Sequence, residues 1–254
     1  MVRILTEKTL ARELFAGWED TMVCSCLQGV MGELYVTDAT APRSAMALAA
    51  GFAFLAGEPE IAYLEWIGEH CPLEWMLLIP QNEDWSRVIR HRFGERAHRF
   101  LRYATVKDPA TFDREKLRRM ATPVPEGCEL LAIDRQLFHL CRKENWSRDL
   151  VDNYSDYESF SRLGLGYVLI RQGELLAGAS SYFSYQGGIE IEIDTREDMR
   201  RRGYARLCGA RLILSALERG LYPSWDAHSL ASLSLAEQLG YRLSHSYPAF
   251  EILT

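Results

Sequence analysis

The segment from Ile189 to Gly220 constrains the fold more than any other part of this 254-residue chain. Isoleucine alternates with acidic residues from Ile189 to Asp194, and this period of two is that of a β-strand. From Tyr204 onward, apolar residues recur at the spacing of one helical face, and Gly220 stands where a helix C-cap belongs. The sequence therefore predicts a strand, a turn rich in arginine and a long amphipathic helix.

The predicted turn has the chemistry of an anion-binding site. Arg200, Arg201 and Arg202 supply positive charge. Gly203 lets a ligand approach the backbone closely, and the small side chain of Ala205 keeps the start of the helix open. The first turn of a helix also leaves backbone N–H groups unpaired and carries the positive end of the helix dipole. Such a turn favours phosphate, and a solvated basic turn is the alternative.

Two motifs resemble those of the GNAT N-acetyltransferase superfamily, which binds acetyl-coenzyme A. The pattern Arg200-x-x-Gly203-x-Ala205 is similar to its pyrophosphate loop, Arg/Gln-x-x-Gly-x-Gly/Ala. The segment 229–241 has the spacing of its Asn-x-x-Ala/Ser-x-x-Leu-Tyr-x-x-x-Gly-Phe pattern. The run Pro-x-Trp-Asp-Ala that begins at Pro223 resembles the bacterial "GNAT acetyltransferase" family, which also carries an N-terminal extension.

The order of predicted elements after residue 126 agrees with this resemblance: a strand, two helices, three strands, then helix, strand, helix and strand. The resemblance implies an α/β chain with a mixed α+β sheet, in which residues 126–254 adopt the GNAT acyl-CoA N-acyltransferase fold. Residues 1–120 are predicted to form a smaller mixed α/β domain of unassigned function. The charged segment 108–126, which contains three prolines, is predicted to be the linker.

Three segments carry more local predictions. The apolar, alanine-rich run 44–60 is predicted to be a buried strand, with a helix as the alternative. Segment 222–227 is predicted to be one strand that begins near a proline. The helix 229–239 is predicted to be capped by Ser229 and to end at Gly240.

The resemblance implies transfer of an acetyl group from acetyl-coenzyme A to a primary amine by direct attack, with a small-molecule or peptide amine as acceptor. The thioester carbonyl is then expected near a backbone N–H at Thr195, and the pyrophosphate on the amides of residues 201–205. The implied cofactor-binding residues are Thr195, Arg200, Arg201, Arg202, Gly203, Tyr204, Ala205, Ser229 and Ser232.

An amine acceptor must lose a proton, because a lysine-like ammonium has a pKa of ~10.4. Glu190, Glu192 and Asp194 share one face of the predicted strand. Burying these carboxylates is costly without a cavity or partners, so we expect the row to open onto a polar cleft. There it would attract a cationic amine or supply the catalytic base. A solvated or salt-bridged face is the alternative.

The proton donor to the leaving thiol is harder to predict. The tyrosine that usually serves this role in the superfamily falls at Ala236. Tyr247 is the predicted replacement, and Tyr241, His228 and Ser232 are the alternatives. Because the usual tyrosine is missing, a non-catalytic acyl-coenzyme A sensor or interaction module is the second functional hypothesis.

Composition limits the remaining classes of function. The net charge of −6 and the isoelectric point near 5.6 argue against a protein whose main role is to bind nucleic acid or an anionic membrane. No apolar run approaches the ~20 residues of a membrane helix, and the charged N-terminal stretch does not resemble a signal peptide, so a cytoplasmic location is expected. No metal site is expected, because Cys24-x-Cys26 lacks a second ligand pair at zinc spacing.

Overall fold

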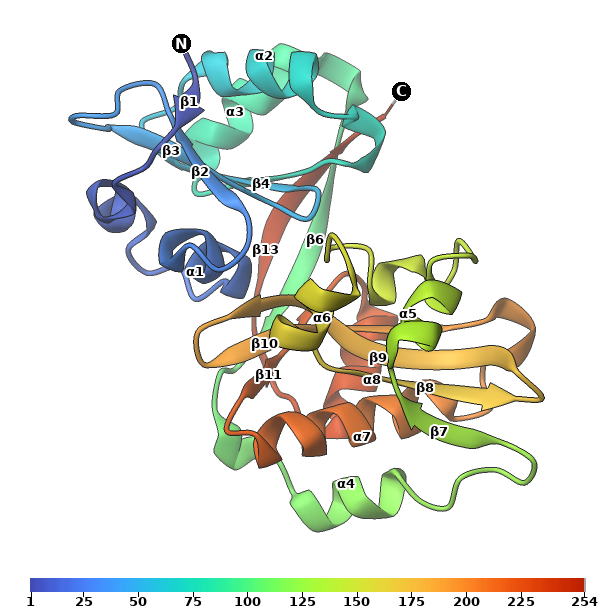
Figure 1. Ribbon diagram of the computed structural model, residues 1–254. Coiled ribbons are helices and arrows are strands. Elements are labelled where there is room, and N and C mark those ends of the chain that lie inside the picture. Colours follow the sequence, from blue (N-terminus) through green and yellow to red (C-terminus); the bar gives the residue numbers. More distant parts are fainter. Residues whose placement is uncertain (254) are drawn as a thin grey trace. The chain divides into compact units, whose positions relative to one another are not determined.

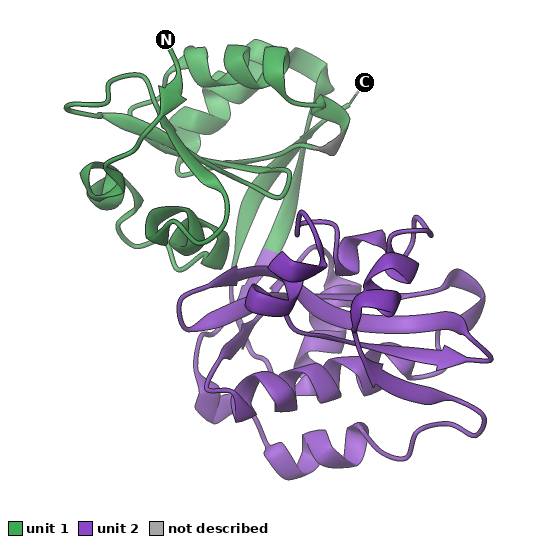
Figure 2. Cartoon of the chain, in the orientation of Figure 1, with its two compact units in different colours: residues 1–102, 246–254 green, residues 103–245 purple. Residues whose placement is uncertain are grey.

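The computed structural model describes residues 1–253, apart from the side chain of Trp75. The chain divides into two units, shown in different colours in Figure 2. Unit 1 comprises Met1–Arg102 with Ser246–Thr254, and unit 2 comprises Tyr103–His245. This division differs from the predicted 1–120 and 126–254.

Unit 1 is built on a mixed sheet with the strand order β1-β2-β3-β4-β5-β13-β6. Its strands pair in antiparallel fashion from β1 to β4, whereas β4 and β5 are parallel. Helices α2 and α3 lie together on one side of this sheet (Figure 1). The elements are β1 (Arg3–Ile4), η1 (Lys8–Phe15), α1 (Thr21–Gln28), β2 (Glu33–Val36), β3 (Ser44–Ala49), β4 (Phe52–Gly57), α2 (Ile61–His70), η2 (Leu73–Trp75), β5 (Leu77–Pro80), α3 (Glu83–Phe93), η3 (Gly94–Arg96), β6 (Ala97–Thr105) and β13 (Leu243–Ile252).

The alanine-rich run 44–60 forms a hairpin, where the sequence predicted one strand or a helix. β3 and β4 pair from Ser44 opposite Gly57 to Ala49 opposite Phe52. The two residues between them, Ala50 and Gly51, have φ angles of 50° and 81°. Positive φ at both central residues is typical of the tight turns that join antiparallel strands. This turn is hard to predict from sequence, because alanine rarely adopts a positive φ angle.

Unit 2 contains a second sheet with the strand order β11-β10-β9-β8-β7. β7, β8, β9 and β10 pair in antiparallel fashion, and β10 and β11 are parallel. Helices α5 and α6 lie over one face of the sheet, and α7 and α4 over the other (Figure 1). The elements are η4 (Pro109–Thr111), α4 (Arg114–Met120), β7 (Glu129–Ala132), α5 (Arg135–Cys141), η5 (Arg148–Leu150), α6 (Tyr157–Leu163), β8 (Gly166–Arg171), β9 (Glu174–Tyr185), β10 (Gly188–Thr195), η6 (Glu197–Met199), α7 (Tyr204–Glu218), β11 (Tyr222–Ser224), β12 (Asp226–Ala227) and α8 (Leu230–Leu239).

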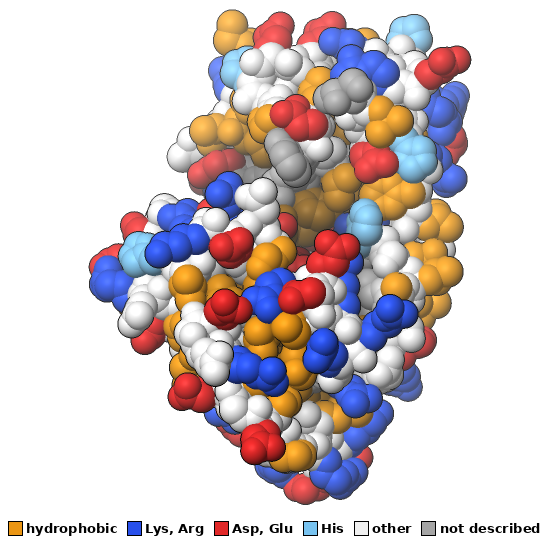
Figure 3. Space-filling view, turned by 90° about the vertical axis from the view of Figure 1, so that its right-hand side faces the viewer, with side chains coloured by type: hydrophobic (Ala, Val, Ile, Leu, Met, Phe, Trp, Pro, Cys, Tyr) orange, Lys and Arg blue, Asp and Glu red, His pale blue; other side chains and the backbone are white. Residues whose placement is uncertain are grey.

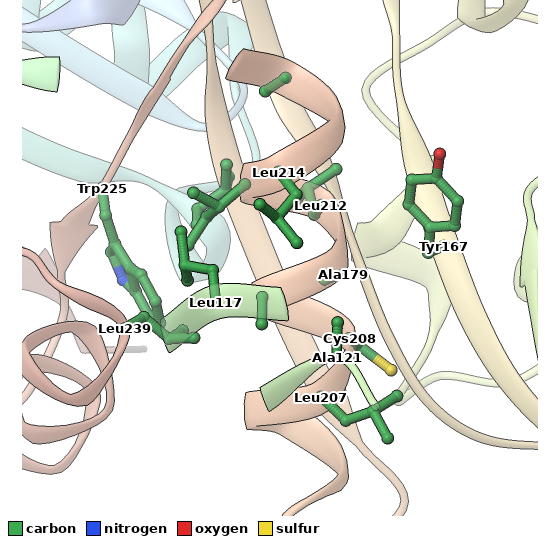
Figure 4. Close-up of a cluster of buried hydrophobic side chains, with 14 of the residues drawn as sticks. Leu117, Ala121, Tyr167, Ala179, Leu207, Cys208, Leu212, Leu214, Trp225 and Leu239 are labelled. Atoms are coloured by element: carbon green, nitrogen blue, oxygen red, sulfur yellow. The ribbon is translucent and has the colours of Figure 1, made fainter. Parts of the chain in front are cut away.

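The central helix α7 organises the core of unit 2. Its Leu207, Leu212 and Leu214 belong to one buried cluster with residues of β8, β9, α4 and α8 (Figure 4). Leu117 and Ala121, at α4 and its end, are part of the same cluster and are 1% and 7% exposed. The segment 108–126 is therefore not the predicted linker, since it belongs to unit 2 and its Phe112, Leu117 and Ala121 are buried there. One buried residue per helical turn, Leu117 and then Ala121, is enough to attach α4 to the core, and the charged residues around them hid this pattern in the sequence.

The same order of elements occurs twice along the chain. From β1 to β6, and again from β7 to β13, a first strand is followed by helical segments, three antiparallel strands, a helix, a strand, a helix and a last strand, apart from short 3-10 helices and the two-residue strand β12. The last strand of the second run, β13, pairs with β5 in the sheet of unit 1. The order of the first five strands is also the same, β1-β2-β3-β4-β5 in unit 1 and β7-β8-β9-β10-β11 in unit 2. Unit 1 therefore repeats the topology of unit 2, which the sequence did not predict.

The surface carries both signs of charge. On the face drawn in Figure 3, Lys and Arg side chains are interspersed with Asp and Glu side chains. That face lacks the continuous basic stripe that is typical of nucleic-acid-binding proteins. Among residues 1–253, none of the helices has the length and apolar character needed to cross a membrane.

Candidate functional site

Strand β10 loses one of its two partners halfway along its length. On one side it pairs with β9 from Gly188 to Thr195, with a register shift between Glu190 and Ile191. On the other side it pairs with β11 only from Gly188 to Glu190. The chain after β11 continues into β12, which pairs with the end of β6. Within the described part of the chain, the second edge of β10 thus has no strand partner from Ile191 to Thr195, and an extended ligand can pair there.

This departure corrects the prediction that 222–227 is one strand. Trp225 separates β11 from β12 and is 6% exposed. Its carbonyl accepts a hydrogen bond from Thr105 Oγ1 at 2.6 Å, and its indole Nε1 donates to Ser232 Oγ at 3.2 Å. The contact with Thr105 comes from a segment 120 positions away, so local patterns could not predict the break.

The turn between β10 and α7 has an unusual backbone. Arg201 and Gly203 both have positive φ angles, 61° and 82°. Gly203 is the N-cap of α7, and no side chain caps the helix. The first helical hydrogen bond runs from the N–H of Leu207 to the carbonyl of Gly203 at 3.0 Å. The N–H groups of residues 204–206 therefore have no acceptor within the helix, and together with the helix dipole they form an anion-binding surface.

A pocket of about 490 Å³ lies at this turn. The predicted site residues that line it come from the end of β10, the turn and the start of α7; they are Asp194, Thr195, Arg200, Arg201, Gly203, Tyr204 and Ala205. The fold thus brings most of the predicted cofactor-binding residues together around one cavity. Their role in binding a cofactor stays a prediction.

Asp194 is the acidic residue of the predicted row that lines the pocket. Its side chain is partly buried, and this burial raises the pKa of its carboxyl group to about 6. The negative charge of Asp149 raises the pKa further, and the nearby Arg200 guanidinium opposes the shift. A carboxyl group with a pKa near neutrality can both accept and release a proton at physiological pH.

Thr195 follows Asp194 and has a buried hydroxyl oxygen for which the described residues provide no hydrogen-bond partner. An unsatisfied buried polar atom is uncommon in native proteins, and where it occurs it is often part of a functional site. This atom therefore marks the end of β10 as a place that accommodates a further polar group.

Glu190 does not open onto a cleft, contrary to the prediction. It is 5% exposed, and its Oε1 accepts a hydrogen bond from the N–H of Asp226 at 2.7 Å. Glu190 is also the last residue of β10 that pairs with β11. Its carboxylate therefore stabilises the point where the two strands separate.

Glu192 lies farther along β10 and is partly buried. Its Oε1 accepts a hydrogen bond from the backbone N–H of Ile193 at 3.0 Å. It is not one of the residues that line the pocket. The three acidic residues share a strand face, as the alternation predicted, but their surroundings differ and they do not form one cleft.

The predicted residues on α8 have structural partners. Ser229 caps the helix, as predicted, because its hydroxyl accepts a hydrogen bond from the N–H of Ser232 at 3.2 Å. Ser232 in turn accepts a hydrogen bond from Trp225. Neither serine lines the pocket, and neither does Arg202.

The structure narrows the choice of proton donor. Ala236 is fully buried in the core cluster. Tyr241 is 2% exposed and donates its hydroxyl hydrogen to the carbonyl of Pro223 at 2.6 Å. Its hydroxyl group is therefore part of the core and already has an acceptor. His228 is exposed. Tyr247 belongs to unit 1, and the role of Tyr247 in the site stays a prediction.

Sequence analysis missed several residues of the pocket. These are Ile193, Met199, Arg206, Leu235 and Gln238. Leu235 and Gln238 lie three positions apart on α8, and Leu235 is three positions after Ser232. Residues three apart share a helix face, so the motif could have predicted this row.

Comparisons with known proteins agree with the fold. A sequence profile of the GNAT acetyltransferase family matches residues 12–250. The uncharacterized N-acetyltransferase YdfB of Bacillus subtilis (strain 168) is 23% identical over 240 residues, which are 91% of this chain and 89% of that protein. A GCN5-related N-acetyltransferase-like protein from Streptococcus suis 89/1591 is 47% identical, and the two structures superimpose with a TM-score of 0.92 over 97% of this chain and 98% of the other.

A more distant structure resembles the chain in fold alone. A tandem GNAT protein from the clavulanic acid biosynthesis pathway is 11% identical, with a TM-score of 0.61 over 98% of both chains. This agrees with the repeated order of elements in units 1 and 2. Because the family profile spans nearly the whole length, the mixed α/β chain with its separated strands and basic helix start belongs to the GNAT acetyltransferase family.

Proposed function

We propose that this protein transfers an acetyl group from acetyl-coenzyme A to a primary amine. Membership of the GNAT acetyltransferase family supports N-acetyltransferase activity in general. The observation that carries the more specific proposal is the separation of β10 from β11 after Glu190, next to the arginine-rich start of α7. An unpaired strand edge and an anion-binding turn suit a long ligand with a phosphorylated end.

The residues present fit such a ligand. A Cβ atom built on Gly203 would meet only Arg206 Nη2, at 3.6 Å, so the space above the turn is open. Arg200, Arg201 and the N–H groups of residues 204–206 would hold the diphosphate. The edge of β10 from Ile191 to Thr195 would hold the extended arm, provided that Glu192 releases the N–H of Ile193. When bound, acetyl-coenzyme A supplies the activated acetyl group.

Asp194 is the residue that we propose as the base. Its carboxyl group lines the pocket, and its pKa of about 6 leaves it mostly ionised at neutral pH. It can therefore accept a proton from the acceptor's ammonium, directly or through water. The same group can release that proton again after each turnover, because its pKa lies close to the working pH.

The alternative is a non-catalytic acyl-coenzyme A sensor, and the burial of Ala236 favours it. The position of the family's usual tyrosine lies in the core, and Tyr241 donates its hydroxyl hydrogen to a backbone carbonyl. A thiol is nevertheless a tolerable leaving group, so the missing tyrosine need not abolish transfer. The cytoplasmic location expected from the sequence stays a prediction.

The test is a measurement of thiol release from acetyl-coenzyme A with a panel of primary amines, run beside calorimetric titration of the cofactor. The proposal expects saturable cofactor binding and turnover with at least one amine. Tight binding without turnover on any amine would favour the sensor. Absence of binding would contradict both functions.

A further inference from the structure

The short helix η5 brings a second carboxylate to the end of β10. η5 packs against both β9 and β10. Its middle residue, Asp149, is exposed, and its negative charge acts on the carboxyl group of Asp194. The two residues lie 45 positions apart in the sequence, so only the fold brings them together. Asp149 is not one of the residues that line the pocket.

Hydrogen bonds from β9 hold the segment around Asp149 in place. Ser180 Oγ donates to the carbonyl of Leu150, the residue after Asp149. The Leu150 side chain is fully buried against Gly178, where a Cβ atom would lie only 2.5 Å from Leu150 Cδ1. The position of Asp149 beside β10 is therefore fixed by close packing on a rigid strand.

A second anchor lies four residues farther along. The hydroxyl of Tyr154 is buried and bonds to Ser181 Oγ at 2.7 Å and to Ser184 Oγ at 2.9 Å. Asn153 Nδ2 donates to the carbonyl of Tyr182 at 3.1 Å. Because these hydrogen bonds already fix the segment, a charged side chain on it loses little conformational entropy when a ligand binds.

The charges around the pair have both signs. Partial removal from water raises the pKa of the Asp149 carboxyl group, the negative charge of Asp152 raises it further, and Arg148 opposes the shift. Asp149 raises the pKa of Asp194, and Arg200 opposes it. Repulsion between like charges is relieved when a cation binds between them. Because Asp194 also lines the pocket beside the unsatisfied hydroxyl of Thr195, that cation would lie next to the proposed reaction site.

We propose that Asp149 and Asp194 together bind the ammonium group of the acceptor, so that the substrates are cationic primary amines and Asp149 is a positioning residue. This inference rests on the proposed function. One ammonium proton passes to the Asp194 carboxylate. The amine nitrogen then forms a bond to the acetyl carbon as the carbon–sulfur bond breaks, and a second nitrogen proton passes to the sulfur.

The first test needs neither cofactor nor turnover. Carboxyl signals of the free protein are followed by NMR across a pH titration, in the wild type and in Asp149→Asn. The inference expects the titration midpoint of Asp194 to fall by about half a pH unit or more in the variant. Asp152→Asn is the matched control, since Asp152 acts on Asp149, and it should leave that midpoint in place. An unchanged midpoint in Asp149→Asn would overturn the pairing.

The second test is kinetic. Asp149→Asn should raise the KM for a cationic amine by roughly tenfold, leave kcat within about threefold and leave the affinity for acetyl-coenzyme A unchanged. Asp149→Glu should recover part of the loss. An equal KM in wild type and Asp149→Asn, or better turnover of anilines that are neutral at assay pH, would overturn the inference while the acetyltransferase proposal stands. Failure of the wild type to bind acetyl-coenzyme A would instead overturn the proposed function, and the NMR titration would still decide the pairing.

Discussion

Gly203 combines an exposed position with a conformation that side chains rarely adopt. Its φ is 82°, and an added Cβ would meet no atom closer than 3.6 Å. Replacement by alanine is therefore opposed by backbone strain rather than by a clash, at about 1 kcal/mol. We expect Gly203→Ala to lower the free energy of unfolding by that amount and to weaken acetyl-coenzyme A binding, as measured by urea titration and calorimetry.

Gly127 offers the matched control. Its φ is 71° and nothing lies within 4 Å of its added Cβ, and it is not a residue of the pocket. Gly127→Ala should produce a similar loss of stability without any change in cofactor affinity. Equal effects of the two variants on binding would show that the turn before α7 has no special role.

Asp194 should make stability depend on pH. Its pKa is about 6 in the folded protein, against 3.8 for the free side chain. Between these values the folded state binds more protons than the unfolded state, so the contribution of Asp194 to stability falls as pH rises through this window and is constant above it. We expect Asp194→Asn to remove this decline, on the order of 3 kcal/mol. Urea titrations of both proteins on either side of the window measure it, and parallel pH profiles would contradict the assignment.

At the scale of residues, the sequence predicted which residues lie at the site better than it predicted the environment of each side chain. Alternation correctly placed Glu190 and Asp194 on one strand face, and the glycine motif correctly marked the turn that lines the pocket. It could not predict that Glu190 is enclosed, because its partner Asp226 reaches it only after β11 ends. The sequence also did not predict that Asp149 lies near Asp194, because the two residues belong to segments that only the fold brings together.

At the scale of elements, the buried side chain of Glu190 stabilises the point where β10 separates from β11. Glu190 accepts a hydrogen bond from the N–H of Asp226, and its side chain is 5% exposed. We expect Glu190→Ala to lower the free energy of unfolding by about 1–3 kcal/mol, because the N–H of Asp226 would lose its acceptor. Glu190→Gln keeps an oxygen acceptor and should be milder. Chemical denaturation compares them, and equal losses would mean that the hydrogen bond is not the cause.

Elements set by local chemistry were predicted well. Gly203 precedes α7, and Ser229 and Gly240 bracket α8, as the sequence indicated. The missed features have tertiary causes. The break at Trp225 depends on Thr105 and Ser232, and the core position of α4 depends on α7. Periodicity reports what a segment can form but not which segment will pair with it.

At the scale of the whole molecule, unit 1 depends on the C-terminal end of the chain. β13 pairs with β5, with Phe250 opposite Leu78, and Phe250 is fully buried in the core of unit 1. We expect Phe250→Ala to lower stability by about 3–5 kcal/mol and to speed hydrogen exchange in α2 and α3. Leu253→Ala, at a residue that is 49% exposed, is the control and should change stability by less than about 0.5 kcal/mol. A similar response to both changes would contradict the role of β13.

The repeated topology raises the question of whether unit 1 also binds a cofactor. Its strands β4 and β5 remain paired from Phe52 opposite Leu77 to Leu55 opposite Pro80, and the N–H of Gln81 then donates to the carbonyl of Leu55 at 3.0 Å. Unlike β10 and β11, these strands stay together where the ligand would enter. The first condition for binding an extended ligand is therefore missing in unit 1.

The turn that precedes α2 also differs from the turn that precedes α7. It contains Glu58 and Glu60 and no arginine, and Glu60 accepts a hydrogen bond from Thr37 Oγ1 at 2.9 Å. A Cβ atom on Gly57 would lie 2.3 Å from the carbonyl oxygen of Arg43, so this turn is filled by the protein itself. We therefore expect calorimetric titration with acetyl-coenzyme A to give one site per chain, and Gly203→Ala to weaken all of the binding. Two sites per chain, or a second site that Gly203→Ala leaves untouched, would mean that the acidic turn of unit 1 can rearrange to accept a phosphate.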